Sequence, residues 1–366
     1  MKRGFLAGLA VVAFCTAAAP VMAQEKGGLD QTGAYEPVVG WFKPGIDRWD
    51  RPMASVTVDK PDRIFMTTAP VRFTRPNAPM LTADGKLMEE KSQASTIPAD
   101  KQAHDNIILV LNGEGKVIEN WKQWDKDITF AHNIEISPYD PDRAVWVMDL
   151  GHQILKFTND GKKMLMRLGE KDKPAWDATH FNMPSSMAFY PDGSFVVADG
   201  YVNARIVKFD KNGKYISEFG SKGSGPGQFD LVHSVAIDKQ GRVYTADRRN
   251  HRIQVFDANG KFIEEWKNVG SPTRLIITED QYLWMSDADY NRFAKFDLSG
   301  KLITYFGVLG RNPGEFDNLH NWDVDASGNL FVADGGNNRI QKLVAKKGAD
   351  PVRLIGQQFF LPALKK

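Results

Sequence analysis

The sequence predicts an all-β protein, a six-bladed β-propeller built from four-stranded antiparallel blades. The first observation is a complete module at residues 230–266, where four short apolar or β-branched runs are separated by tight turns and one polar loop. The second is its repetition, because the second run of each copy ends on an aspartate every 40 to 50 residues: Asp149, Asp199, Asp247, Asp287 and Asp334. This period is typical of propeller blades.

Six copies of the module fill residues 53–366, and most of them turn at a Gly-Lys pair between their third and fourth runs. The first copy, at about 53–121, is irregular because residues 68–105 separate its second and third runs. Insertions of this length are usually lids or disordered segments, and the predicted position on the rim favours a lid. Strands from the two chain ends must close the ring, and the candidates are residues 38–39 and 354–355.

The first 23 residues predict a secretory signal peptide. Lys2 and Arg3 precede an apolar run at 5–19 and a small-residue ending at Ala23. This run is shorter than the roughly 20 residues of a membrane span, so we expect no span and an exported protein, periplasmic or extracellular. Residues 24–52 are punctuated by glycine and proline and predict a lead-in that packs on the propeller.

Composition narrows the classes of partner. The 47 basic and 45 acidic residues give a formal net charge of +2, which gives no support for a nucleic-acid partner. The only cysteine, Cys15, lies in the predicted leader, so the mature chain has no thiol for disulfides or thiolate chemistry. We expect a monomer that acts on a small molecule or a peptide-derived substrate.

Histidine recurs at the start of the innermost strand in alternate blades. Aligning the copies places His132, His233 and His320 in blades two, four and six, and Ser185 and Thr273 in blades three and five. In a six-fold ring these histidines stand about 120° apart and face the central channel, so three imidazoles can converge on one metal ion. A single inward histidine is more often structural, but three in one register indicate a shared metal. Zinc suits neutral imidazoles with an open position.

The loops after the repeated aspartates share this rim and supply the other candidates. Tyr201 and Arg248 do not recur between blades, and a tyrosinate can act as a base while an arginine can hold a carboxylate. His152 and His180 fall on the same face, where we expect loop hydrogen bonds, with substrate contact as the alternative. Other residues of these loops recur and indicate blade architecture: Asn203 with Arg205, Asn250 with Arg252, Asn291 with Arg292, and Asn338 with Arg339.

The repeated Val-Ala-Asp and Asn-x-Arg-Ile patterns, with the Pro-Gly-containing turns at 225–229 and 313–316, resemble NHL-repeat propellers. More narrowly, residues 130–343 resemble the peptidyl-α-hydroxyglycine α-amidating lyase family, through the alternating histidines and the segment 199–206. The resemblance implies zinc on the three histidines, Tyr201 as catalytic base and Arg248 as an active-site arginine. It implies a lyase that cleaves a carbinolamide C–N bond to give an amide and glyoxylate.

The chain departs from the family pattern at several positions. The family's acidic residue after the last zinc ligand, tied to a structural calcium, is Asn321 here, which leaves Ca²⁺ as an open expectation. A second catalytic arginine belongs to the family's first blade, and Arg72 is its candidate counterpart, with Arg75 as the alternative. The ligand histidines follow residues other than the family's proline: Ala131, Val232 and Leu319.

Two other functions fit the same sequence. One is a non-catalytic NHL propeller that binds a protein or a glycan on its rim. The other is a metal-dependent hydrolase on this scaffold; a lactonase with calcium would rely on acidic and amide oxygens, whereas the inner register here carries imidazoles. Bound metal separates the enzymes from the binding propeller.

Overall fold

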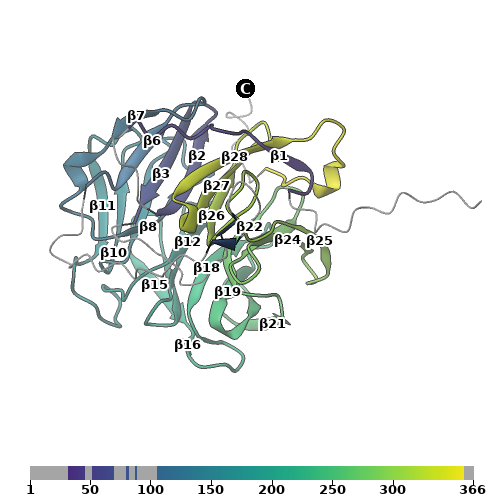
Figure 1. Ribbon diagram of the computed structural model, residues 1–366. Coiled ribbons are helices and arrows are strands. Elements are labelled where there is room, and N and C mark those ends of the chain that lie inside the picture. Colours follow the sequence, from purple (N-terminus) through teal and green to yellow (C-terminus); the bar gives the residue numbers. More distant parts are fainter. Residues whose placement is uncertain (1–31, 46–51, 70–79, 82–86, 89–104, 358–366) are drawn as a thin grey trace, which may run out of the picture.

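Six four-stranded antiparallel sheets surround a central axis (Figure 1). The computed structural model describes residues 32–45, 52–69, 80–81, 87–88 and 105–357. Each blade runs outward from an innermost strand that lines the axis, in the order in which the chain supplies the strands. The predicted all-β, six-bladed fold is therefore confirmed.

The strands of the first three blades have the following bounds. Blade one contains β2 (Met53–Lys60), β3 (Arg63–Thr68), β6 (Ile108–Leu111) and β7 (Val117–Asn120); blade two contains β8 (Ala131–Ile136), β9 (Val145–Asp149), β10 (Gln153–Phe157) and β11 (Met164–Gly169); blade three contains β12 (Ser186–Phe189), β13 (Phe195–Asp199), β14 (Arg205–Phe209) and β15 (Tyr215–Phe219).

Blades four to six follow the same order, with one exception at the end of the ring. Blade four contains β18 (Val232–Ile237), β19 (Val243–Asp247), β20 (Arg252–Phe256) and β21 (Phe262–Lys267); blade five contains β22 (Pro272–Ile277), β23 (Tyr282–Asp287), β24 (Arg292–Asp297) and β25 (Leu302–Phe306); blade six contains β26 (Leu319–Val324), β27 (Leu330–Asp334), β28 (Arg339–Ala345) and β1 (Tyr35–Pro37).

Short elements join these strands. Two small sheets pair β4 (Met80–Leu81) with β5 (Leu87–Met88) and β16 (Ser221–Lys222) with β17 (Gln228–Phe229). The helical turns of the described residues are 3-10 turns: η2 (Lys122–Trp124), η3 (Arg248–Asn250), η4 (Gly335–Asn337) and η5 (Pro351–Arg353). Among these same residues, no helix is long and apolar enough to cross a membrane.

The N-terminal segment closes the ring. β1 pairs antiparallel with β28, with Tyr35 opposite Ala345, and becomes the outer strand of blade six (Figure 1). The lead-in thus contributes a strand that ends directly before the predicted 38–39. Residues 354–355 form no strand, but the Ile355 amide donates a hydrogen bond of 2.8 Å to the Tyr35 hydroxyl. The predicted signal peptide, most of the insertion at 68–105, Arg72 and Arg75 lie outside the described residues.

The hydrophobic core is divided among the seams between blades. Six clusters of buried apolar residues each join two neighbouring blades, as where Trp41 and Met53 of the first blade's cluster pack with Phe331 of blade six. Because a lone four-stranded sheet is only marginally stable, each blade depends on its two neighbours for burial. The closed ring therefore holds the innermost strands in fixed positions around the axis.

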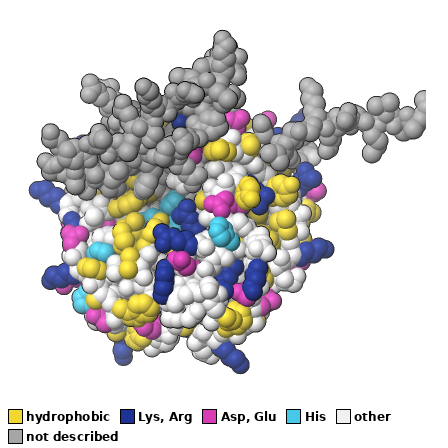
Figure 2. Space-filling model, turned by 60° about the horizontal axis from the view of Figure 1, so that its bottom comes forward, with side chains coloured by type: hydrophobic (Ala, Val, Ile, Leu, Met, Phe, Trp, Pro, Cys, Tyr) yellow, Lys and Arg dark blue, Asp and Glu magenta, His cyan; other side chains and the backbone are white. Residues whose placement is uncertain are grey.

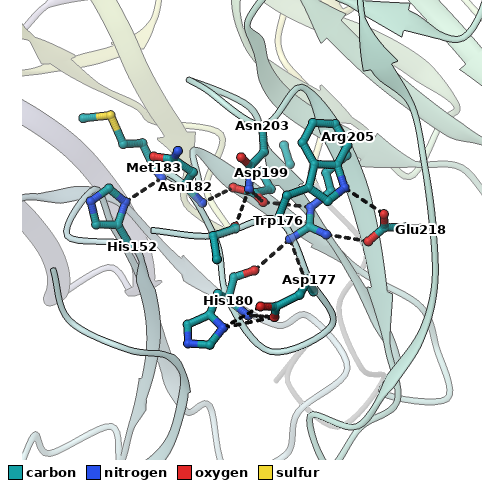
Figure 3. Close-up of polar contacts among 12 residues, drawn as sticks. His152, Trp176, Asp177, His180, Asn182, Met183, Asp199, Asn203, Arg205 and Glu218 are labelled. Atoms are coloured by element: carbon teal, nitrogen blue, oxygen red, sulfur yellow. Dashed lines mark hydrogen bonds and ion pairs between the residues drawn. The ribbon is translucent and has the colours of Figure 1, made fainter. Parts of the chain in front are cut away.

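The repeated aspartates fix the rim loops to the innermost strands. In blade three the fully buried Asp199 accepts hydrogen bonds from the Asn182 amide (2.8 Å), the Asn203 side chain (2.7 Å) and Arg205 Nε (2.9 Å) (Figure 3). Arg205 also donates to the carbonyl oxygens of the neighbouring loop at His180. Burial raises the pKa of Asp199, and these donors oppose that rise.

The same contacts recur around the ring and confirm that these residues are blade architecture. Arg252, Arg292 and Arg339 donate through Nε to the aspartate of their own blade, and Gln153 takes this place in blade two. The predicted asparagines were wrong in two blades. In blade six Asn337, rather than Asn338, donates to the aspartate, and in blade five Asn291 accepts from the Leu319 amide at 3.0 Å instead of donating to Asp287. Positions 291 and 338 both adopt the left-handed conformation (φ 51° and 53°) directly before the third strand.

Candidate metal centre

Each histidine of the inner register occupies a β-bulge. In blade two Ala131 pairs with Asp149 and Asn133 with Met148, so His132 is the extra residue; His233 and His320 are extra residues in the same way. Bulges redirect a side chain and are common beside functional sites. The histidines are thus set by a repeated backbone feature at the start of β8, β18 and β26.

The Nδ1 atom of each imidazole is held by the next blade. His132 Nδ1 lies 3.0 Å from the Ser185 carbonyl oxygen, His233 Nδ1 lies 2.7 Å from that of Thr273, and His320 Nδ1 lies 2.7 Å from that of Ala54. A carbonyl oxygen only accepts, so Nδ1 carries the proton in all three rings. Nε2 is then the atom with a lone pair, as in histidines that bind metals.

The three rings converge. Their centroids are 4.7 to 5.1 Å apart, and one nitrogen from each lies within 4.8 Å of the other two. Burial lowers the pKa of His132 and His233 well below the ordinary value and lowers that of His320 to about 4. Three neutral imidazoles with converging lone pairs form a set of donors that can hold one metal ion.

Tyr201 lies directly beside these nitrogens. Its hydroxyl oxygen is 3.0 Å from His132 Nε2 and 3.0 Å from His233 Nε2. Because one phenol proton can satisfy only one of two lone pairs, this arrangement leaves a ring nitrogen available for a cation. Burial raises the pKa of Tyr201 to about 12, and the charges of Arg248 and Arg249 oppose this rise.

The loop that carries Tyr201 depends on a glycine. A Cβ atom at Gly200 would lie 1.6 Å from the Val232 carbonyl oxygen, at the start of the innermost strand of the next blade. Only a residue without a side chain allows this close approach of the two backbones. Gly200 therefore places Tyr201 against the histidines.

A cavity of about 620 Å³ opens above the centre and is lined by His132, His320, Tyr201 and Arg248. Arg248 Nε lies 3.4 Å from the Ser271 hydroxyl, and the arginine charge acts on all three histidines. Apolar residues of blades one, two and four complete the walls: Met53, Ala54, Ala69, Phe130, Leu150 and Leu231. Figure 2 shows a face on which histidine side chains lie among cationic and apolar ones, the combination that lines this cavity.

Three ionisable residues that line the cavity were absent from the sequence prediction: Arg249, His251 and Asp289. Arg249 and His251 do not recur in other blades, which is the signal that could have found them. Conversely, His152 and His180 do not line the cavity. His152 Nδ1 accepts from the Met183 amide at 3.2 Å, and His180 Nδ1 lies 2.9 Å from Asp177 (Figure 3). Both are loop hydrogen-bonding residues.

A buried polar layer lies one step further along the inner strands. Asn321 donates to Asn133 at 2.9 Å and accepts from the Val56 amide at 3.3 Å. Glu135, two residues after Asn133 in β8, forms a buried ion pair with Arg274 of β22 and so links the two strands. These groups do not fit calcium, because Asn321 is uncharged and already hydrogen-bonded and Glu135 is neutralised by an arginine.

Known proteins resemble parts of this chain. A family model described as "6-bladed beta-propeller" matches residues 177–295. Peptidyl-glycine alpha-amidating monooxygenase B of Xenopus laevis is 40% identical over 118 residues, which are 30% of this chain and 14% of that protein. The probable peptidyl-alpha-hydroxyglycine alpha-amidating lyase pgal-1 of Caenorhabditis elegans is 34% identical over 173 residues, 45% of this chain and 48% of that protein.

Two further matches concern the repeat and the fold. NHL repeat-containing protein 3 of Homo sapiens is 29% identical over 41% of this chain and 45% of that protein. A solved streptogramin B lyase structure superposes with a TM-score of 0.54 at 13% identity, covering 82% of this chain and 96% of that one, and supports the fold alone. The matched parts span about half or less of each curated relative. The chain is a six-bladed β-propeller whose homologues, at modest identity, are proteins named for peptidyl-α-hydroxyglycine α-amidating lyase and for NHL repeats.

Proposed function

We propose that this chain is a secreted, zinc-dependent lyase of the amidating-lyase type. It would cleave the C–N bond of a carbinolamide and release an amide and glyoxylate. The observation that carries the proposal is the convergence of three anchored imidazoles, two of which contact the hydroxyl of Tyr201. The names of the relatives support this choice among metal-dependent reactions.

His132, His233 and His320 would hold the ion through Nε2. Three neutral nitrogen ligands with a fourth position open to substrate are the usual donors of catalytic zinc. The carbonyl oxygens that accept from Nδ1 fix each ring in the correct tautomer. A bound zinc ion would supply a Lewis acid that polarises the hydroxyl oxygen of the substrate.

The chain's own residues would carry out the proton transfers. Arg248, Arg249 and a bound cation would oppose the effect of burial on the pKa of Tyr201 and favour its phenolate, which would take the proton of the substrate hydroxyl and return it to the leaving nitrogen. The C–N electron pair moves to nitrogen while the carbon–oxygen bond becomes the carbonyl of glyoxylate, so atoms and charge balance. Arg248 would hold the substrate carboxylate, and we propose Arg72 as the second arginine of the site.

The compartment follows from the N-terminal segment. Residues 1–23 have the charged start, apolar run and small-residue ending of a secretory signal, so we propose export to the periplasm or the extracellular space. The metal ligands include no cysteine, so the site would not compete with disulfide formation in an oxidising compartment.

The test is product identity with zinc-loaded protein and N-benzoyl-α-hydroxyglycine. A lyase releases benzamide and glyoxylate in equal amounts, whereas an amide hydrolase releases benzoate. The His233→Ala variant corrects for spontaneous breakdown. Benzoate as the product would favour the hydrolase alternative, and no product above the variant's background would contradict both.

A further inference from the structure

The cavity mouth carries two basic side chains that the proposed chemistry does not use. Arg249 and His251 belong to η3 and its end, and they line the same cavity as Tyr201 and Arg248. Their side chains are 60% and 54% exposed, whereas Arg248 is half-buried and the histidine ligands are mostly buried. A substrate that reaches the metal centre therefore passes Arg248 near the floor and the other two at the mouth.

Both side chains have polar contacts outside their own loop, Arg249 at the start of blade four and His251 on the side of blade five. Arg249 Nη1 lies 3.6 Å from the Asp230 carboxylate, which Lys222 also binds. His251 Nδ1 lies 3.2 Å from the Gly270 carbonyl oxygen and 3.6 Å from Asp289. The Gly270 carbonyl oxygen accepts from Nδ1–H of His251, so Nε2 is the ring nitrogen left for a substrate carboxylate, to which it donates when the imidazole carries both protons.

The backbone at His251 follows the blade repeat. Its φ of 52° lies in the left-handed region, where a β-carbon is disfavoured and glycine or asparagine is preferred. The residue directly before the third strand also has a positive φ in blades two, three, five and six: His152, Ala204, Asn291 and Asn338. This shared turn sets the position of the His251 imidazole at the cavity mouth.

The charges at the mouth favour an anion. Of the described charged residues that line the cavity, Arg248 and Arg249 are positive and Asp289 is negative, so their charges sum to +1. In comparison, the corresponding loop of blade six begins with two glycines, Gly335 and Gly336. Basic side chains are thus concentrated on the blade-four side of the opening.

We infer that Arg249 and His251 form a second anion subsite, which selects substrates whose acyl group carries a carboxylate of its own. This inference rests on the proposed function, in which Arg248 binds the carboxylate next to the reacting carbon. The second carboxylate belongs to the part of the substrate that leaves as the amide. The substrate class is therefore an N-acyl-α-hydroxyglycine with an acidic acyl group.

The experiment compares two substrates that differ by one carboxylate, N-(4-carboxybenzoyl)-α-hydroxyglycine and N-benzoyl-α-hydroxyglycine. We expect the zinc-loaded wild type to favour the dicarboxylate about tenfold in kcat/KM, as for one charge-assisted contact. Arg249→Gln and His251→Asn should each reduce this ratio to about threefold or less. Asparagine keeps the left-handed backbone available at position 251.

The control variant removes a positive charge from the opposite face of the propeller, at the strand ends away from the cavity. Lys162 lies in the turn between β10 and β11 with its side chain 79% exposed, so Lys162→Gln should keep the tenfold ratio. High salt should lower the ratio in the wild type, because exposed charges are screened. Equal kcat/KM for the two substrates in the wild type, or a preference that survives in both variants, would overturn the subsite.

A failure of the lyase proposal is distinguishable from a failure of the subsite. If neither substrate is cleaved, the unreactive pair N-(4-carboxybenzoyl)glycine and N-benzoylglycine is titrated into the zinc-loaded protein by calorimetry. The subsite predicts about tenfold tighter binding of the dicarboxylate, lost in Arg249→Gln. Equal dissociation constants would overturn the subsite on binding alone.

Discussion

Replacing Tyr201 by phenylalanine removes one oxygen atom from the centre. The variant distinguishes a role of Tyr201 as catalytic base from a role as metal ligand. The hydroxyl contacts Nε2 of both His132 and His233 at 3.0 Å, but its single proton allows only one donated hydrogen bond. Losing one such bond changes the free energy of unfolding of the metal-free protein by about 1 kcal/mol. The ring itself keeps its packing, so we expect the variant to fold.

The expected effect on catalysis is much larger. A positioned acid–base group contributes about 10²- to 10⁴-fold to the rate, so kcat for benzamide release should fall by that factor in Tyr201→Phe. The three imidazoles keep their Nδ1 anchors in the variant, so zinc content should stay equal to that of the wild type. Metal binding also no longer displaces the phenol, so zinc affinity should not fall.

The assay is benzamide release by zinc-loaded Tyr201→Phe under saturating substrate, with zinc measured in the same samples. Full zinc content with kcat reduced at least a hundredfold is the predicted result. Activity within a few-fold of the wild type would refute the role of Tyr201 as base. Loss of zinc together with activity would instead make Tyr201 part of the metal site.

The remaining predictions concern binding, stability and pH. Arg248→Gln should raise KM by about ten- to a hundredfold, because one charge-assisted contact to the substrate carboxylate is lost; an unchanged KM would contradict its role. Arg274→Met should lower the free energy of unfolding by about 3–5 kcal/mol in urea titrations, since Glu135 is left buried without its cation, and Glu135→Leu in the same chain should restore most of it. The metal-free protein should lose thermal stability as the pH falls from about 6.5 towards 4, because burial lowers the pKa of His320 in the folded state to about 4, below the ordinary unfolded value near 6.5. In this window the unfolded chain binds the proton that the folded chain resists, so His320→Gln should show a weaker pH dependence, and an equal slope would contradict the assignment.

Much of the fold could be predicted because one physical role repeats in each blade. Asp199 and its counterparts accept the same backbone and side-chain donors, so they recur at a regular spacing in the sequence. The convergence of His132, His233 and His320 could also be predicted from their spacing in the sequence. The blades are related by rotation about one axis, so residues at equivalent positions of the repeats lie close together around that axis. Tyr201 and Arg248 stood out because they break the repeat.

Other features depend on contacts between residues far apart in the chain. Glu135 and Arg274 are 139 residues apart, and nothing in the local pattern of either strand indicates their pairing. The closing strand β1 has only three residues, too few for a periodic signal. Arg249 and His251 resemble ordinary polar loop residues until the turn at η3 brings them to the cavity.

The central claim is that His132, His233 and His320 form one zinc site, and metal content tests it most directly. Elemental mass spectrometry on the purified mature protein should give close to one zinc per chain. His233→Ala should lose it, while His251→Asn, which changes a histidine outside the triad, should retain it. Absence of metal from the wild type, with none taken up after zinc is added, would contradict the claim and leave a propeller that only binds partners.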